Sequence, residues 1–169
     1  CEGASEVGLL RGLDLFRADH GKPTLTASGV AWVDAKGVSQ IYARANAFQS
    51  LGYRVAVLRD DDAQPDAADE AAFMALGGAV FKWREGCALE DELFLGLSEQ
   101  AAIALLGRAV DLLDQDLVDD HIRSASGGRH TYAECVFALS PEHRATLGAA
   151  ARSKRGAWFK SVTKMEEVA

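Results

Sequence analysis

The first 97 residues alternate between helical periodicity and short apolar runs, and this alternation limits the possible fold more than any other feature. Helical patterns cover residues 5–17, 39–52 and 65–78, and apolar runs cover residues 29–34, 53–58 and 79–83. Helices that alternate with strands are typical of βαβ units, whose strands are parallel. Nearly continuous apolar runs suit strands that are buried beneath helices on both faces. We therefore predict an α/β fold with a parallel sheet and flanking helices.

The rest of the chain has helical patterns without strand signals. One long amphipathic helix is expected from Ser98 to Arg123, and shorter helices are expected over residues 134–139, 141–154 and 158–168. Small residues and paired glycines at 124–128 predict a loop. We expect two domains, residues 1–97 and a helical subdomain over residues 98–169. The opening CEG is typical of the end of a strand, so we also expect that the first strand is truncated.

Composition excludes several classes of protein. The 169 residues are 49% apolar and 25% charged, which is typical of a globular protein with a full core. A net charge of -7 argues against a general nucleic-acid coat, because such proteins rely on dense Lys and Arg. Three cysteines without CxxC spacing support neither a disulfide framework nor a zinc site. With no membrane-spanning run and no signal segment, we expect a cytoplasmic protein with no membrane partner.

Acidic residues stand at the ends of two predicted strands. Glu2 and Glu6 open the chain, and Asp60, Asp61 and Asp62 follow an apolar strand. Ligands of open α/β sheets bind at the carboxyl ends of the strands. Because side chains two apart on an extended segment point the same way, Asp60 and Asp62 can converge while Asp61 faces elsewhere. Clustered carboxylates are the surroundings that Mg²⁺ or Mn²⁺ prefers.

Helix capping is a simpler interpretation of the same residues. Ser5 could be a helix N-cap, with Glu6 favoured by the positive end of the helix. The aspartates at 60–62 could form a solvated turn before a helix that begins near Pro65. Capping explains each cluster separately. It does not explain why both clusters fall where two strand ends of one sheet are expected to meet.

The order Glu2-Gly3-x-x-Glu6, then a strand ending in Asp60-x-Asp62, resembles the Toprim catalytic domain of type IA and II topoisomerases, bacterial primases and OLD nucleases. The strings CEGASEVGLLRGLD, LGYRVAVLRDDD, EGCALEDELF and RGAWFK are most similar to the OLD (overcoming lysogenization defect) nucleases of class 2. The Toprim resemblance covers the first 97 residues, and the remainder is similar to the OLD helical region. It implies a Rossmann-like Toprim sheet followed by a helical subdomain.

The resemblance implies a metal-dependent DNA endonuclease that uses two Mg²⁺ or Mn²⁺ ions. Two such ions can generate a water nucleophile, neutralise the charge that grows on the phosphate and assist the leaving oxygen. The implied metal ligands are Glu2, Glu6, Asp60, Asp62 and Glu90. Asp91 and Glu92 could replace Glu90, and an acidic first helical turn favoured by the helix dipole is the simpler explanation for all three.

A fixed positive charge is the remaining requirement of such a site. The resemblance implies a lysine from the helical region, so Glu2 and Lys160 are the expected catalytic residues. Trp158 and Phe159 can anchor a terminal helix and direct Lys160, whose ammonium would stabilise the negative transition state. Lys164 is the alternative, and solvated lysines on an amphipathic helix are the simpler interpretation. The basic stretch at 151–156 is a candidate contact with the DNA backbone.

The family resemblance also implies partners. An ABC-type ATPase domain precedes the Toprim region in OLD proteins, and this chain has no GxxxxGK[ST] motif, so we expect the nuclease part alone. The full-length protein is expected to be a homodimer that acts on DNA. The four histidines lack ligand spacing, so we expect them at the surface or at helix ends, with His130 a candidate DNA contact.

Other functions stay open, and one is another Toprim-type nucleic-acid enzyme. A haloacid-dehalogenase-like phosphatase also uses DxD after a strand, but it gives Glu2 and Glu6 no role, and Gln64 stands where its motif has Thr or Val. A receiver domain would lack the long helical region. A non-enzymatic, metal-dependent DNA-binding module is a further alternative. A topoisomerase would need a catalytic tyrosine, and no tyrosine has a context that supports this role.

Overall fold

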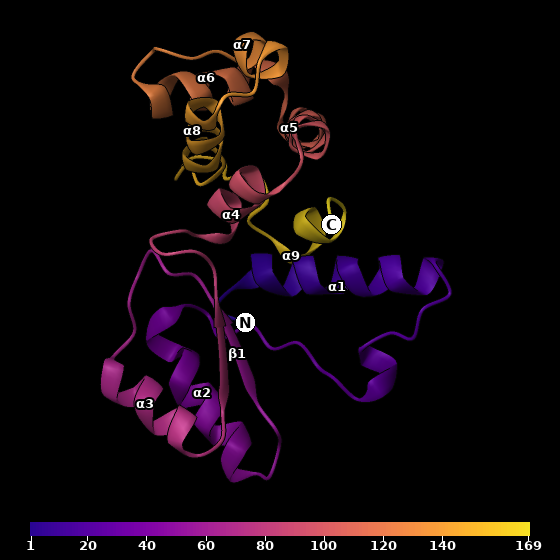
Figure 1. Ribbon diagram of the computed structural model, residues 1–169, viewed down its shortest axis with the longest axis vertical. Helices are drawn as coiled ribbons and strands as arrows, with labels where there is room; N and C mark the ends of the chain where they lie inside the picture. The colour runs from indigo at the N-terminus through magenta and orange to yellow at the C-terminus, as the bar shows by residue number, and fades with distance from the viewer. The chain divides into compact units, whose positions relative to one another are not determined.

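The computed structural model describes all 169 residues, and their contacts divide the chain into two compact units (Figure 1). The first unit comprises residues 1–88, 161–167 and 169, and the second comprises residues 89–160 and 168. The first unit therefore ends at Ala88, whereas the sequence predicts a boundary after residue 97. The last helix of the chain belongs to the first unit. A small parallel sheet among many helices agrees with the predicted α/β class.

The first unit is built around two parallel strands. Its elements in chain order are α1 (Ala4–Asp19), the 3-10 helix η1 (Thr26–Ser28), α2 (Val38–Ser50), β1 (Ala56–Arg59), α3 (Ala67–Ala75), β2 (Ala79–Lys82) and α9 (Val162–Glu166). The register of the sheet pairs Ala56 with Ala79 and Arg59 with Lys82. Its core joins Ile41 and Tyr42 of α2, Val57 of β1 and Phe73 of α3. The predicted helices at 5–17, 39–52 and 65–78 and the strand at 79–83 are confirmed within a few residues.

The predicted strand at 29–34 is wrong, because these residues do not form a regular ladder. The segment pairs only at its end, where Cys1 N donates to Val33 O at 3.0 Å and Ala35 N donates to Cys1 O at 2.9 Å. These two bonds are the pattern of a parallel bridge. On the other side, Glu2 N donates to Leu58 O at 2.9 Å. Residues 1–2 therefore lie between this segment and β1.

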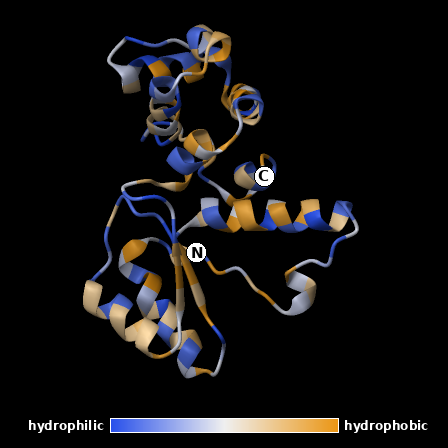
Figure 2. Ribbon diagram, viewed as in Figure 1, coloured by the Kyte–Doolittle hydropathy of each residue, from blue (hydrophilic) through white to orange (hydrophobic).

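Helices α1 and α9 approach each other closely because α1 has glycines at the contact. A Cβ atom added to Gly8 would lie 2.5 Å from Val162 O, and one added to Gly12 would lie 2.7 Å from Glu166 O. Arg11 Nε also pairs with Glu166 Oε2 at 2.8 Å. Apolar and polar residues alternate along α1, as its colours in Figure 2 show. Small residues on one side of α1 thus allow a short terminal helix to pack against it.

The second unit is helical. Its elements are α4 (Leu89–Gly96), α5 (Glu99–Leu113), α6 (Gln115–Ser126), α7 (Tyr132–Phe137) and α8 (Pro141–Ala151). The single long helix predicted over 98–123 is wrong, because Asp114 at φ 138° interrupts it and its side chain caps α6 by accepting from Leu117 N at 2.8 Å. The expected loop at 124–128 begins later, since α6 continues to Ser126. No helix in the chain has the length and apolarity needed to cross a membrane.

Candidate metal centre

Glu2 is held at the end of β1 by its backbone and its side chain. Its N–H donates to Leu58 O, and its carbonyl accepts from Gly37 N at 2.8 Å. Its carboxylate Oε2 accepts from Asp60 N at 3.2 Å, although the two residues are 58 positions apart. The structure therefore brings Glu2 and the acidic segment at 60–62 to one edge of the sheet.

Glu6 lies in the first turn of α1 and is buried, with 3% of its surface exposed. Its Oε2 accepts from Gly3 N at 2.7 Å, which caps the helix. The N-cap residue is Gly3, so the expectation that Ser5 is the N-cap is wrong. Burial raises the pKa of the Glu6 carboxyl, and its hydrogen bonds with backbone N–H groups oppose that rise only in part. Glu6 therefore caps α1 and is also a desolvated acid.

The carboxylates at this edge repel one another. Burial raises the pKa of Glu2, the hydrogen bond from Asp60 N lowers it, and the negative charges of Glu6 and Asp62 raise it further. Like charges in a partly desolvated place disfavour ionisation unless an opposite charge is near. Asp62 is the most exposed of these side chains. A bound cation would relieve this repulsion and favour the ionised form of each carboxylate.

Asp61 has a different role from its neighbours. It is buried, and its carboxylate accepts from Lys82 Nζ at 2.9 Å and from Gly86 N at 3.1 Å. These bonds lower the pKa of Asp61 to about 2. The partners of Asp61 are thus β2, the turn after it and Arg59, and the convergence of Asp60 with Asp62 stays a prediction.

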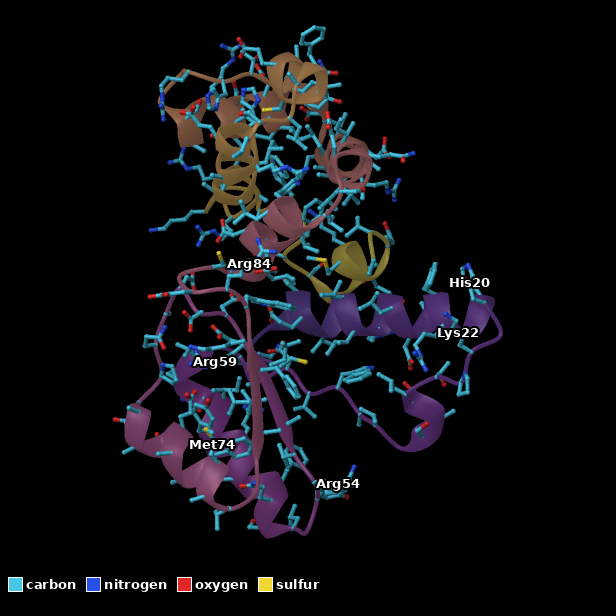
Figure 3. All side chains as sticks on the ribbon, viewed as in Figure 1. His20, Lys22, Arg54, Arg59, Met74 and Arg84 are labelled. Atoms are coloured by element: carbon cyan, nitrogen blue, oxygen red, sulfur yellow. The ribbon has the colours of Figure 1, made fainter.

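Arg59 is the residue at this edge that sequence reasoning missed. It ends β1, is 2% exposed, and extends toward the helices that flank the sheet (Figure 3). Its Nε donates to Glu70 Oε2 of α3 at 3.1 Å, and Tyr42 of α2 donates its hydroxyl to the same oxygen. The signal was present, because Val57 and Arg59 share one face of β1 and that face is buried.

Glu90 belongs to the second unit. It is the second residue of α4 and is 7% exposed, which makes it the most buried of the three acids in that first turn. Asp91 instead pairs with Arg152 Nη2 at 3.2 Å, where α8 packs against α4. A Cβ atom added to Gly148 would lie 2.6 Å from Asp91 Oδ1, so Asp91 fills this contact. Burial distinguishes Glu90 from its two neighbours, whose positions the sequence treats alike.

Lys160 is exposed and directly follows two fully buried aromatic residues of the second unit, Trp158 and Phe159. Trp158 Nε1 donates to His121 Nδ1 at 3.1 Å, so the two aromatics are buried in the second unit and do not belong to the terminal helix. The expected helix over 158–168 is wrong, because Ser161 is the N-cap of α9 and accepts from Lys164 N at 3.1 Å. Lys160 therefore precedes the helix, and Lys164 lies within it in the first unit.

Two histidines are more buried than expected. His121 and His130 are each 8% exposed. His121 accepts the Trp158 indole hydrogen bond, and His130 Nδ1 lies 3.0 Å from Thr146 Oγ1. Each hydrogen bond satisfies one ring nitrogen away from water, so these histidines lie in the interior of the second unit and not on its surface.

We call Glu2, Glu6, Asp60 and Asp62, at the end of β1, the acidic edge. Its side chains supply only oxygen ligands, which is the chemistry that Mg²⁺ or Mn²⁺ requires. No group of three or more His, Cys, Asp or Glu side chains is already arranged around one point as ligands. Glu2 and Glu6 instead accept hydrogen bonds from backbone N–H groups. These four carboxylates therefore fit a divalent cation in the type of their donor atoms and in their common place at the end of β1. They are not already arranged around one ion position.

Comparisons with known proteins give no match: no family model matches the chain, and no curated protein or solved structure is significantly similar to it. The resemblance to Toprim domains and OLD nucleases stays a prediction carried by the motifs.

Proposed function

We propose that this chain is a divalent-metal-dependent DNA endonuclease. Its carboxylates Glu2, Glu6, Asp60 and Asp62 would hold Mg²⁺ or Mn²⁺ at the end of β1. The observation that carries the proposal is the bond between Glu2 Oε2 and Asp60 N at 3.2 Å, which joins two acidic motifs from distant parts of the sequence. Burial and the nearby Glu6 and Asp62 raise the pKa of Glu2, so a cation is the natural partner of this cluster.

The proposed chemistry divides between the metal ions and the chain. Two bound ions would supply a water nucleophile and neutralise the charge of the phosphate in the transition state. Glu6 is buried and would bind from within, whereas Asp62 is exposed and marks the side open to a DNA phosphate. Glu90 is the proposed fifth carboxylate, and Lys160 the proposed group that stabilises the transition state.

DNA binding by this chain should be weak and strongly dependent on salt. The net charge is -7, so most of the surface repels a phosphate backbone. Lys154 and Arg155 are exposed and are the proposed backbone contacts, whereas Arg152 already pairs with Asp91. The ABC-type ATPase and the homodimer implied by the OLD resemblance belong to the same proposal, and they would add affinity that this chain lacks.

Nicking of supercoiled plasmid tests the proposal directly. We expect nicked and linear products with Mg²⁺ or Mn²⁺, none with EDTA, and none from Asp60→Ala, which removes a proposed ligand. Activity that persists in Asp60→Ala would indicate a contaminating nuclease. Metal binding without cleavage would favour the DNA-binding alternative. Release of phosphate from small phosphomonoesters without plasmid nicking would favour a phosphatase.

A further inference from the structure

We propose that Arg59 is the positioning residue of the acidic edge, which fixes the backbone from which Asp60 and Asp62 extend. The inference rests on the proposed metal-dependent function and adds a residue that no motif of the sequence assigns to it. Its basis is geometric: the guanidinium lies beneath the acidic segment and contacts the backbone of one proposed ligand directly.

The contacts of Arg59 reach the acidic segment at two points. Nη1 donates to Asp60 O at 2.8 Å and lies 3.5 Å from Asp61 Oδ1. Nη2 lies 3.4 Å from Gln64 Oε1, and Gln64 Nε2 in turn donates to Asp61 O at 2.9 Å. The guanidinium plane therefore bonds the carbonyl of Asp60 and, through Gln64, the carbonyl of Asp61. The guanidinium of Arg59 thus fixes the peptide groups on both sides of Asp61.

The guanidinium is itself held from the other side. Nε donates to Glu70 Oε2 of α3, and the same carboxylate accepts the hydroxyl of Tyr42 from α2. Burial alone would lower the pKa of Arg59, but Glu70 and Tyr42 raise it above its ordinary value, so the group stays charged. Two cations, Arg59 and Lys82, face two anions, Asp61 and Glu70. Charge balance and packing by two helices thus leave the guanidinium one orientation.

This orientation bears on the proposed ligands. The backbone of Asp60 is held on both sides of its Cα atom: its carbonyl accepts from Arg59, and its N–H donates to Glu2 Oε2. A backbone rotation at Asp60 that turned its Cα–Cβ bond away from the edge would also break the bond to Arg59. Arg59 therefore holds the backbone of Asp60 in place before a cation binds.

A purely structural role is the competing explanation, because a buried ion pair can support the sheet without affecting a metal site. The two explanations predict different metal binding in the variants Arg59→Lys and Glu70→Gln. Lysine keeps the charge but loses the planar fork that bonds two carbonyls. Glutamine at 70 keeps the shape but removes the anion that holds the guanidinium. A positioning role predicts weaker metal binding in both variants even where the fold is retained.

The test is Mn²⁺ titration of the chain, followed by electron paramagnetic resonance of free Mn²⁺, with far-UV circular dichroism to verify folding. We expect Arg59→Lys and Glu70→Gln to raise the Kd for Mn²⁺ by about 10- to 100-fold, the usual effect of losing a group that orients metal ligands. Asp14→Asn is the matched control. Asp14 is also a buried acid of the first unit, but it bonds only Leu25 and Thr26.

The outcomes distinguish failure of the positioning role from failure of the proposed function. If the unmodified chain binds no Mn²⁺ at millimolar metal, the proposed function fails and the inference fails with it. If the unmodified chain binds Mn²⁺ and both folded variants bind equally well, only the positioning role is overturned. Equal weakening in Asp14→Asn would also overturn it, because general destabilisation would then explain the effect. If Arg59→Lys does not fold, Glu70→Gln alone decides the question.

Discussion

Lys82 Nζ lies 2.9 Å from Asp61 Oδ1, and this pair joins the end of β2 to the acidic segment after β1. With the N–H of Gly86 it lowers the pKa of Asp61 to about 2, below an ordinary value of 3.8. A carboxyl with a lowered folded-state pKa contributes stability that is present above its ordinary pKa and is lost as the pH falls through the folded value. The free energy of unfolding at acidic pH therefore depends on the ionisation of Asp61.

We expect Asp61→Asn to destabilise the chain at neutral pH and the loss to shrink as the pH falls from 3.8 to about 2. Urea unfolding of both proteins across this range measures the difference. Asp66→Asn is the comparison, since Asp66 caps the exposed start of α3. A difference between Asp61→Asn and the unmodified chain that stays constant with pH would show that the Asp61 charge has no part in it.

Glu2 and Glu6 should have the opposite pH dependence in the metal-free chain. Burial raises the pKa of both carboxyls, so their contribution to stability is full below the ordinary pKa of 4.5 and is lost as the pH rises through the raised values. We expect Glu2→Gln to be more stable than the unmodified chain in EDTA above those values, and equal to it in acid.

Added Mn²⁺ should stabilise the unmodified chain and leave Glu2→Gln unchanged, because a bound ligand stabilises only the state that binds it. The urea midpoints of the unmodified chain and of Glu2→Gln, each measured in EDTA and in Mn²⁺, test both expectations. Stabilisation of both proteins by Mn²⁺ would place the ion away from Glu2.

Gly8→Ala should destabilise the chain by about 1–3 kcal/mol, the usual cost of overpacking. Its Cβ atom would lie 2.5 Å from Val162 O and 2.7 Å from Met165 Cβ, and the backbone oxygen cannot move away alone. Gly107→Ala is the control, because no atom lies within 4 Å of its added Cβ atom and Gly107 is inside α5. We expect it to raise stability by roughly 0.5–1 kcal/mol through helix propensity. Equal effects on urea unfolding would contradict the close approach of α9 to α1.

Lys160→Ala should lower the rate of plasmid cleavage by about 10²–10³-fold, typical of losing one group that stabilises transition-state charge. The Kd for Mn²⁺ should stay unchanged, because an ammonium group is not a metal ligand. Asp60→Ala should weaken metal binding and cleavage together. Lys164→Ala is the control, since Lys164 lies within α9. If Lys164→Ala is inactive and Lys160→Ala cuts normally, the catalytic charge comes from α9.

Local patterns in the sequence were sufficient for most helices of this protein. The helical periodicity of residues 5–17 and 39–52 predicts α1 and α2, and the apolar run at 79–83 predicts β2. These elements follow from neighbours one or two turns apart, so the sequence determines them locally.

Tertiary structure decided the remaining features. The run at 29–34 has the composition of a strand, but its ladder-type bond is at Val33, with Cys1. The long periodic segment from Ser98 divides at Asp114, where a change of chain direction outweighs helical propensity. Arg59 is buried among Glu70, Tyr42 and Asp61, whose contacts with it depend on the packing of α2, α3 and β1. The sequence thus determined which acids the chain carries, and only long-range packing decided which of them share an edge and what holds them there.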